Sequence, residues 1–140
     1  MKKLYLYLIS LFVLSGVLLA ACSGGNSNSP VGTWRLVSYG SPGNLTPAAP
    51  DVDTSIVFTE DGKVEGNVGC NGFGGDYTVE GNTITFGPIV STLMLCEGPV
   101  GDQETTTLNV LAETATFIIE GDTVTITSAD GTSVIVLERK

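Results

Sequence analysis

The chain has 140 residues, a net charge of −9 at neutral pH and no histidine, and 42% of its residues are hydrophobic. A chain of this length predicts one folded domain. The missing histidine excludes Cys-His and Ser-His-Asp catalysis and imidazole metal ligands. Acidic residues outnumber basic ones, which excludes the positively charged surface that binding of nucleic acid requires.

Residues 1–21 have the pattern of a lipoprotein signal peptide. Lys2 and Lys3 precede an uncharged apolar run that ends in "LLAAC" at Cys22. A basic start, an apolar stretch and small residues before the cleavage site are typical of secretory signals. The pattern predicts cleavage before Cys22 and acylation of that cysteine, palmitate included, which anchors the protein to a membrane outside the cytoplasm. The alternative is an uncleaved transmembrane helix.

Residues 22–30 predict the lipidated cysteine and a flexible tether, and residues 31–140 a single domain. "SGGNSNSP" is rich in glycine and serine, the composition of a flexible linker. Two of the six basic residues lie in the signal peptide, so the mature chain keeps four against fifteen acidic residues, a net charge of −11. This charge mainly indicates solubility and disfavours binding of the domain itself to anionic membranes, and it is compatible with a basic partner.

Most of the domain predicts β-strands joined by glycine turns. Gly40–Asp51, rich in proline and glycine, predicts a loop after the first strand. Turns are expected at Asp61-Gly62, where both positions tolerate positive φ, and at three later glycine pairs. The expected strands are Thr33–Tyr39, Ser55–Thr59, Lys63–Gly69, Tyr77–Val79, Thr83–Phe86, "STLMLC" at 91–96, and a three-stranded meander over 116–139, turning at Gly121-Asp122 and Asp130-Gly131.

One segment, "VGDQETTTLNVLAET" at 100–114, predicts a short helix. Leu108 and Leu111 are three residues apart, Asp102 is a candidate N-cap, and Glu104 falls in the first turn. Alternation on the strands, and one face of this helix, predict the core. The expected core residues are Trp34, Leu36, Ile56, Phe58, Ile84, Phe86, Leu108, Leu111, Ile118, Val124, Ile126, Ile135 and Leu137.

The glycine-rich stretch "GNVGCNGFGGDYTV", residues 66–79, contains Cys70. Once Cys22 is lipidated, Cys70 and Cys96 remain, an even number in an oxidising compartment, which favours a disulfide over two buried free thiols. Two cysteines are too few for a Cys₄ zinc site, and the chain has no D-x-D-x-D-G calcium loop. The sequence therefore predicts no metal and no cofactor.

Cys70 and its surroundings also carry a family resemblance. The run "GCNGFGGDYTVEGNTITFGPIVSTLMLC", followed by Glu104 and the predicted helix, resembles the META domain of HslJ-like proteins. The opening "GTWRLVSY" and the closing "DGTSVIVLER" are similar to the ends of that family. Two positions depart from it: Gly72 stands where a basic or polar residue is common, and Leu95 where a small residue is usual. The resemblance implies a mainly β fold with one short helix, a curved antiparallel sheet or incomplete barrel packed on that helix. It also implies an envelope protein associated with stress response.

These observations favour a non-catalytic, membrane-tethered envelope lipoprotein that binds a protein or apolar partner. The candidate binding patch is Asn71, Phe73, Tyr77 and Met94, because aromatic and methionine side chains are frequent at binding surfaces. The competing interpretation makes the two aromatic residues and Met94 core and Asn71 a turn cap. The alternative functions are a surface-presented peptidase or lysozyme inhibitor, acting through Gly40–Asp51, and an unrecognised hydrolase.

Overall fold

The computed structural model describes residues 28–140. The predicted signal peptide and Cys22 lie outside the described residues, as does most of the predicted tether. Within residues 28–140, no helix is long and apolar enough to cross a membrane.

Strands make up most of the described chain, together with one helix. The strands are β1 (Gly32–Ser41), β2 (Asn44–Pro47), β3 (Ser55–Phe58), β4 (Lys63–Asn67), β5 (Gly72–Glu80), β6 (Thr83–Phe86), β7 (Val90–Ser91), β8 (Thr114–Glu120), β9 (Thr123–Ser128) and β10 (Val134–Arg139), and the helix is α2 (Gly98–Val110).

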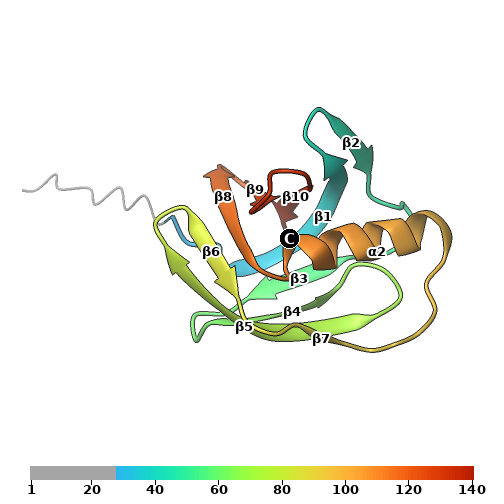
Figure 1. The fold of residues 1–140 in the computed structure, drawn as a ribbon, viewed down its shortest axis with the longest axis horizontal. Coiled ribbons are helices and arrows are strands. Elements are labelled where there is room, and N and C mark those ends of the chain that lie inside the picture. The colour runs from blue at the N-terminus through green and yellow to red at the C-terminus, as the bar shows by residue number, and fades with distance from the viewer. Residues whose placement is uncertain (1–27) are drawn as a thin grey trace, which may run out of the picture.

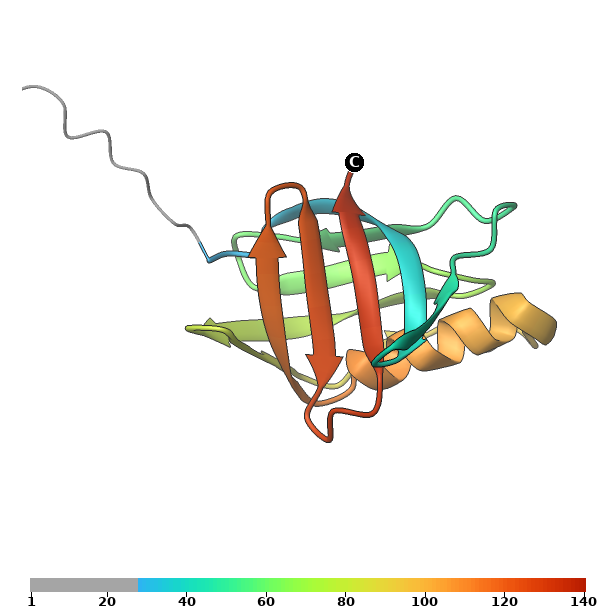
Figure 2. The same cartoon turned by 90° about the horizontal axis from the view of Figure 1, so that it is seen from above.

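The strands form one antiparallel sheet that closes on itself. Its order is β10-β9-β8-β6-β5-β4-β3-β1, and β1 also pairs with β10, so eight strands form a ring. Within residues 28–140 the structure confirms a mainly β fold with one helix. The barrel is closed, which goes beyond the expected curved sheet or incomplete barrel. Figures 1 and 2 show β8, β9 and β10 opposite the layer of β3, β4 and β5.

Helix α2 lies at one end of the barrel, and the chain enters at the other (Figures 1 and 2). The helix begins at Gly98 with Glu97 as N-cap and a proline in its first turn, so Asp102 is not the N-cap that the sequence suggested. Pro99 has a fixed φ suited to a first helical turn, and this explains the earlier start. Leu111, at the C-cap, is buried, and Leu108 packs half-buried against the core.

The predicted turns occur where glycine allows a left-handed backbone. Gly62, Gly81, Gly121 and Gly131 all have φ between 61° and 78°. At the first turn only the glycine has positive φ, and its N–H donates to the Thr59 carbonyl at 3.1 Å. The turn is therefore closed by one left-handed glycine, rather than by two residues with positive φ.

The core fills the barrel interior and matches the expected alternation, with one exception. Eleven of the thirteen predicted core residues are buried, and Leu108 is half-buried. Ile118 was wrongly predicted as core, since it is 57% exposed, while Phe117 is fully buried. The inward set on β8 is Ala115 and Phe117, so the predicted register of this strand was off by one residue.

Two other predicted segments differ from the structure. Gly40–Asp51 contains β2, which pairs with β1 through Asn44–Pro47, so part of the expected loop is a hairpin. "STLMLC" was predicted as a strand, but strand pairing stops at Ser91. The residues between Ser91 and α2 follow a path that side chains determine, as described next.

Candidate functional site

A buried hydrogen-bond pair joins the start of β5 to helix α2. The backbone N–H of Asn71 donates to Glu104 Oε2 at 2.7 Å, and Asn71 Nδ2 donates to Glu104 Oε1 at 2.6 Å. Asn71 is 5% exposed and Glu104 is 7% exposed. A carboxylate is tolerated in such a place only when donors satisfy it. Both oxygens of Glu104 are satisfied by one residue.

Asn71 also fixes the segment that follows β7. Its Oδ1 accepts bonds from the Thr92 hydroxyl and the Met94 N–H, each at 2.8 Å. Its Nδ2 donates to the Met94 carbonyl at 3.1 Å. The side chain therefore supplies the pairing that a neighbouring strand would otherwise supply. Residues 92–94 are held in place although they lie beyond the end of the strand.

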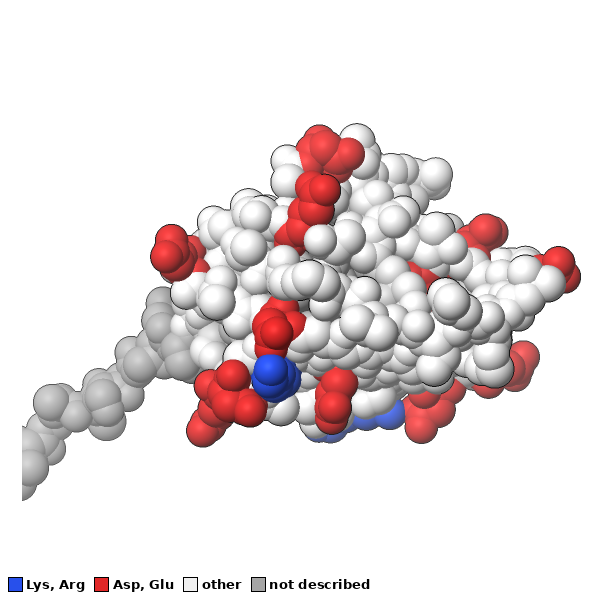
Figure 3. Space-filling model, turned by 60° about the horizontal axis from the view of Figure 1, so that its bottom comes forward, with Lys and Arg blue, Asp and Glu red and all other residues white. Residues whose placement is uncertain are grey.

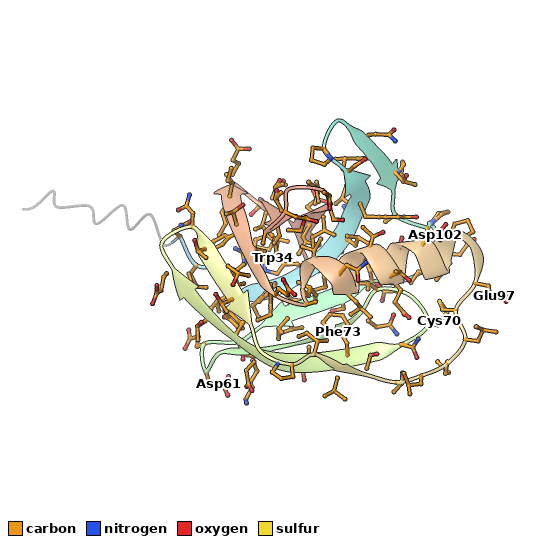
Figure 4. The ribbon with its side chains drawn as sticks, viewed as in Figure 1. Trp34, Asp61, Cys70, Phe73, Glu97 and Asp102 are labelled. Carbon is orange, nitrogen blue, oxygen red and sulfur yellow. A yellow bond between two sulfur atoms is a disulfide. The ribbon has the colours of Figure 1, made fainter. Side chains whose placement is uncertain are left out.

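A disulfide between Cys70 and Cys96 holds the same segment from its other end. The two Cα atoms lie 5.7 Å apart, and 26 positions separate the residues in the chain. Helix α2 packs closely here, because a Cβ on Gly101 would lie 2.3 Å from the Cys96 carbonyl oxygen. Figure 4 shows Cys70 at the helix end of the barrel. The expected cysteine pair is thus close, and it is bonded.

The four residues of the predicted binding patch do not share one surface. Asn71, Phe73 and Tyr77 are at most 8% exposed, and only Met94 is accessible, at 60%. Phe73 and Tyr77 occupy inward positions on β5, as Figure 4 shows for Phe73 inside the barrel. The predicted binding patch is therefore wrong for these three residues, which are buried and cannot contact a partner. The competing core interpretation fits both aromatic residues and fails for Met94.

Tyr77 has a structural role in the barrel. Its ring packs edge-to-face on Phe58 at 5.2 Å between centroids, and its hydroxyl donates to the Thr59 carbonyl at 2.8 Å. Burial raises the pKa of Tyr77, and the nearby charge of Asp61 raises it further. The phenol therefore stays protonated and serves as a donor to the first turn.

An exposed apolar surface lies next to the predicted patch, in the segment 91–96, for which the sequence predicts a strand. We call residues 93–95 the apolar loop. Leu93 is 97% exposed, Met94 60% and Leu95 84%, and Val90 just before them is 72% exposed. The run of three apolar residues before a helix was the available signal. It was missed because an apolar run after a strand ordinarily continues that strand inward.

A groove runs beside this loop on the outer face of the sheet. It has a volume of about 590 Å³ and a mainly apolar surface, and β3, β4, β5 and β7 contribute to its lining. Gly72 forms part of its floor, and Val90 and Thr92 line one side. Volumes of this order are common among ligand sites. Within residues 28–140, no three Cys, Asp or Glu side chains are grouped as metal ligands would be.

The comparisons with known proteins agree with this fold. A solved NMR structure of a protein from Burkholderia xenovorans is 18% identical, with a TM-score of 0.63 over 78% of this chain and 81% of that one. A second NMR structure is 21% identical, with a TM-score of 0.58 over 75% and 86% of the two chains. A duf4847 family protein from Bacteroides vulgatus is 14% identical, with a TM-score of 0.54 over 78% and 92%.

At these identities the solved structures show the fold alone. No curated protein matches the chain. The family is established by a sequence model, that of the META domain, which matches residues 28–140. This range contains the Cys70–Cys96 disulfide, the Asn71–Glu104 pair and the whole barrel. The chain belongs to the META domain family.

Proposed function

We propose that this protein is a non-catalytic lipoprotein of the cell envelope that binds another protein through its apolar loop. The observation that carries the proposal is the exposure of Leu93, Met94 and Leu95, three consecutive residues of one short segment. Exposed apolar residues scattered singly need no explanation, but a contiguous group marks an interaction site. Asn71 and the disulfide hold the loop in place, so little conformational entropy is lost when it binds.

The position of the chain entry supports a protein partner over the membrane. Asn28 Nδ2 donates to the Gly81 carbonyl at 2.7 Å, which fixes the start of the described chain at the β5–β6 turn. The apolar loop adjoins the opposite, helix end of β5 (Figures 1 and 2). A lipid anchor at Cys22 would join the barrel at the end opposite this loop, which leaves the loop free to meet a protein. The acidic surface also disfavours contact with anionic lipids.

The anchor is tested by mass spectrometry of the protein purified from membranes. We expect an N-terminal Cys22 that carries acyl chains, and a Cys22→Ser variant that keeps residues 1–21. An unmodified Cys22 within an intact N-terminus would refute the lipoprotein assignment.

The binding surface is tested by site-specific cross-linking in intact cells. A photoreactive amino acid at Leu93 is expected to give a discrete cross-linked species, and one at Thr78, an exposed residue of the same sheet, is not. The substitution Leu95→Ser, made in the Leu93 probe protein, should remove the species. No species at Leu93, or the same species at both positions, would refute the proposal.

The inhibitor alternative makes a different prediction in the same experiment. It assigns the contact to the β1–β2 hairpin, where Leu45 is 41% exposed and the strand projects from the barrel (Figure 1). A photoreactive residue at Leu45 would then capture a peptidase or lysozyme. The hydrolase alternative would need two carboxylates facing each other. The buried carboxylate of Glu104 instead accepts both of its bonds from Asn71.

A further inference from the structure

Two glycines on the outer face of β5 have no structural reason to be glycine. Neither Gly72 nor Gly74 has a positive φ. A Cβ on Gly72 would come no nearer than 3.9 Å to another atom, and one on Gly74 no nearer than 3.6 Å. A glycine inside a strand weakens the strand and often marks a place where a ligand approaches closely.

Neighbouring glycines show what a packing requirement looks like. A Cβ on Gly66 would lie 2.0 Å from the Ser55 carbonyl oxygen, and one on Gly75 would lie 2.7 Å from Ile89 Cδ1. At these two positions even a methyl group would collide with a neighbouring atom. Gly72 and Gly74 accept one with ordinary contacts at most, and Gly72 lines the open groove.

The sheet register places these two glycines between side chains of β4 and side chains of β7, which we call the walls of the groove. Gly74 pairs with Glu65 of β4 on one side and with Val90 of β7 on the other. Gly72 pairs with Asn67, and its carbonyl accepts the Thr92 N–H at 3.0 Å. Because paired residues point to the same face, side chains of β4 and β7 flank a floor without side chains. Two strand spacings, roughly 10 Å, separate the backbones of the walls.

The wall residue Glu65 is a carboxylate that the described residues leave without a cation. The described chain has four basic side chains, and each pairs with another acid. These pairs are Arg35–Glu138, Lys63–Asp76, Arg139–Asp122 and Lys140–Asp53. Acidic side chains predominate over basic ones on the side of the molecule that Figure 3 shows. The charge complement of such a surface is basic.

We propose that this groove receives an aromatic side chain from a basic segment of the partner protein. A flat ring covers a glycine floor well, and aromatic side chains packed over strand glycines stabilise sheets. The amide of Asn67 and the hydroxyl of Thr92 can bond a ring N–H or O–H at the rim. Glu65 attracts a lysine or arginine beside the ring. This inference deepens the proposed function and rests on it, because the groove is lined by Val90 and Thr92 and the apolar loop begins at the next residue, Leu93.

The experiment is an NMR titration of the mature chain, carrying Cys22→Ser, with the peptide Lys-Trp-Lys. We expect saturable shifts of the Gly72, Gly74 and Thr92 amides with a dissociation constant of about 1 mM, measured up to about 10 mM peptide. Lys-Leu-Lys should bind about tenfold more weakly, because it lacks the flat ring. The variant Glu65→Gln should weaken Lys-Trp-Lys binding by about fivefold and leave ring preference unchanged.

Filling the floor provides the decisive variant. Gly74→Val should abolish the shifts, whereas Thr78→Val, on the same face of the same strand, should not; Gly72→Val answers the question if Gly74→Val fails to fold. Unsaturable shifts, shifts elsewhere, equal binding of the leucine peptide, or self-association through the groove would overturn the inference. In cells, a cross-link at Leu93 that survives Gly74→Val refutes only the groove. No cross-link at all refutes the proposed function itself.

Discussion

The carboxylate of Glu104 and the side-chain amide of Asn71 lie 2.6 Å apart, although 33 positions separate them in the chain. This bond joins the helix to the strand that carries the glycine floor. The same amide binds the backbone of Met94. One buried side chain therefore connects the helix, the sheet and the apolar loop.

Replacing Asn71 by alanine should destabilise the protein by about 3 kcal/mol, because it leaves a buried carboxylate without its side-chain donor and frees the loop. Chemical denaturation measures this loss. Asn44→Ala, on the exposed strand β2, is the matched control, and its effect should stay within about 0.5 kcal/mol. Equal effects of the two substitutions would show that the buried Asn71–Glu104 pair does not contribute more to the free energy of unfolding than an exposed residue does.

The disulfide should contribute about 3.5 kcal/mol to the free energy of unfolding, the chain-entropy value for a loop of this length. The double substitution Cys70→Ser and Cys96→Ser tests this in denaturant. Amide exchange should also rise in residues 92–96 before it rises in the barrel strands, since the loop loses one of its two attachments. A protein whose loop exchange is unchanged would show that Asn71 alone suffices to hold the loop.

Adjacent residues of β8 give a sharp test of the barrel register. Phe117→Ala should cost about 3–5 kcal/mol as a buried aromatic deletion. Ile118→Ala should cost less than about 1 kcal/mol, because that side chain is 57% exposed. Thermal or denaturant unfolding distinguishes them. If Ile118 were the more sensitive position, the register of β8 in the structure would be wrong.

This register also shows what the sequence can and cannot predict. Turns at Gly62 and Gly121 were predictable, because their chemistry depends on adjacent residues. Apolar residues on both sides of β8 gave no clear alternation, so pattern alone misplaced Ile118. Closure of the barrel depends on pairing of β1 with β10, about a hundred residues away, and local patterns carry no such information.

The candidate site was predictable in part for the same reason. Cysteine counting placed Cys70 near Cys96, but it could not show that Asn71 turns inward or that Leu93 turns outward. Both orientations depend on the hydrogen bonds between the Asn71 side chain and the Met94 backbone. These bonds take the place of strand pairing after β7. Residue types in the sequence indicated the region around Cys70 and Cys96. Tertiary contacts determine which side chains of that region are accessible.

Asp130 should titrate well below an ordinary aspartate. Hydrogen bonds from the Ser128 hydroxyl, then from the backbone and hydroxyl of Thr132, lower its pKa to about 2. Because the folded pKa is below the unfolded one, the group stabilises the fold above about pH 4 and loses this contribution as pH falls toward 2. Carboxyl NMR titration measures the value. Ser128→Ala should raise it, and a pKa that stays unchanged would show that the hydroxyl is not responsible.

Gly74 and Gly75 are neighbours on β5, and alanine should affect them in opposite directions. At Gly74 the nearest atom to a new Cβ is the Val64 carbonyl oxygen, 3.6 Å away, which is an ordinary contact. Gly74→Ala should therefore stabilise the protein by about 0.5–1 kcal/mol, through the smaller entropy of the unfolded chain.

At Gly75 a Cβ would lie 2.7 Å from Ile89 Cδ1 and 2.9 Å from the Pro88 carbonyl oxygen. Gly75→Ala must displace the segment that leads into β7, and it should cost about 1–3 kcal/mol. Denaturant unfolding of both variants beside the unsubstituted protein gives the two signs. A destabilised Gly74→Ala would mean that the fold itself requires that glycine. The absence of a side chain at position 74 would then be a requirement of the fold. It would no longer support a ligand above the groove.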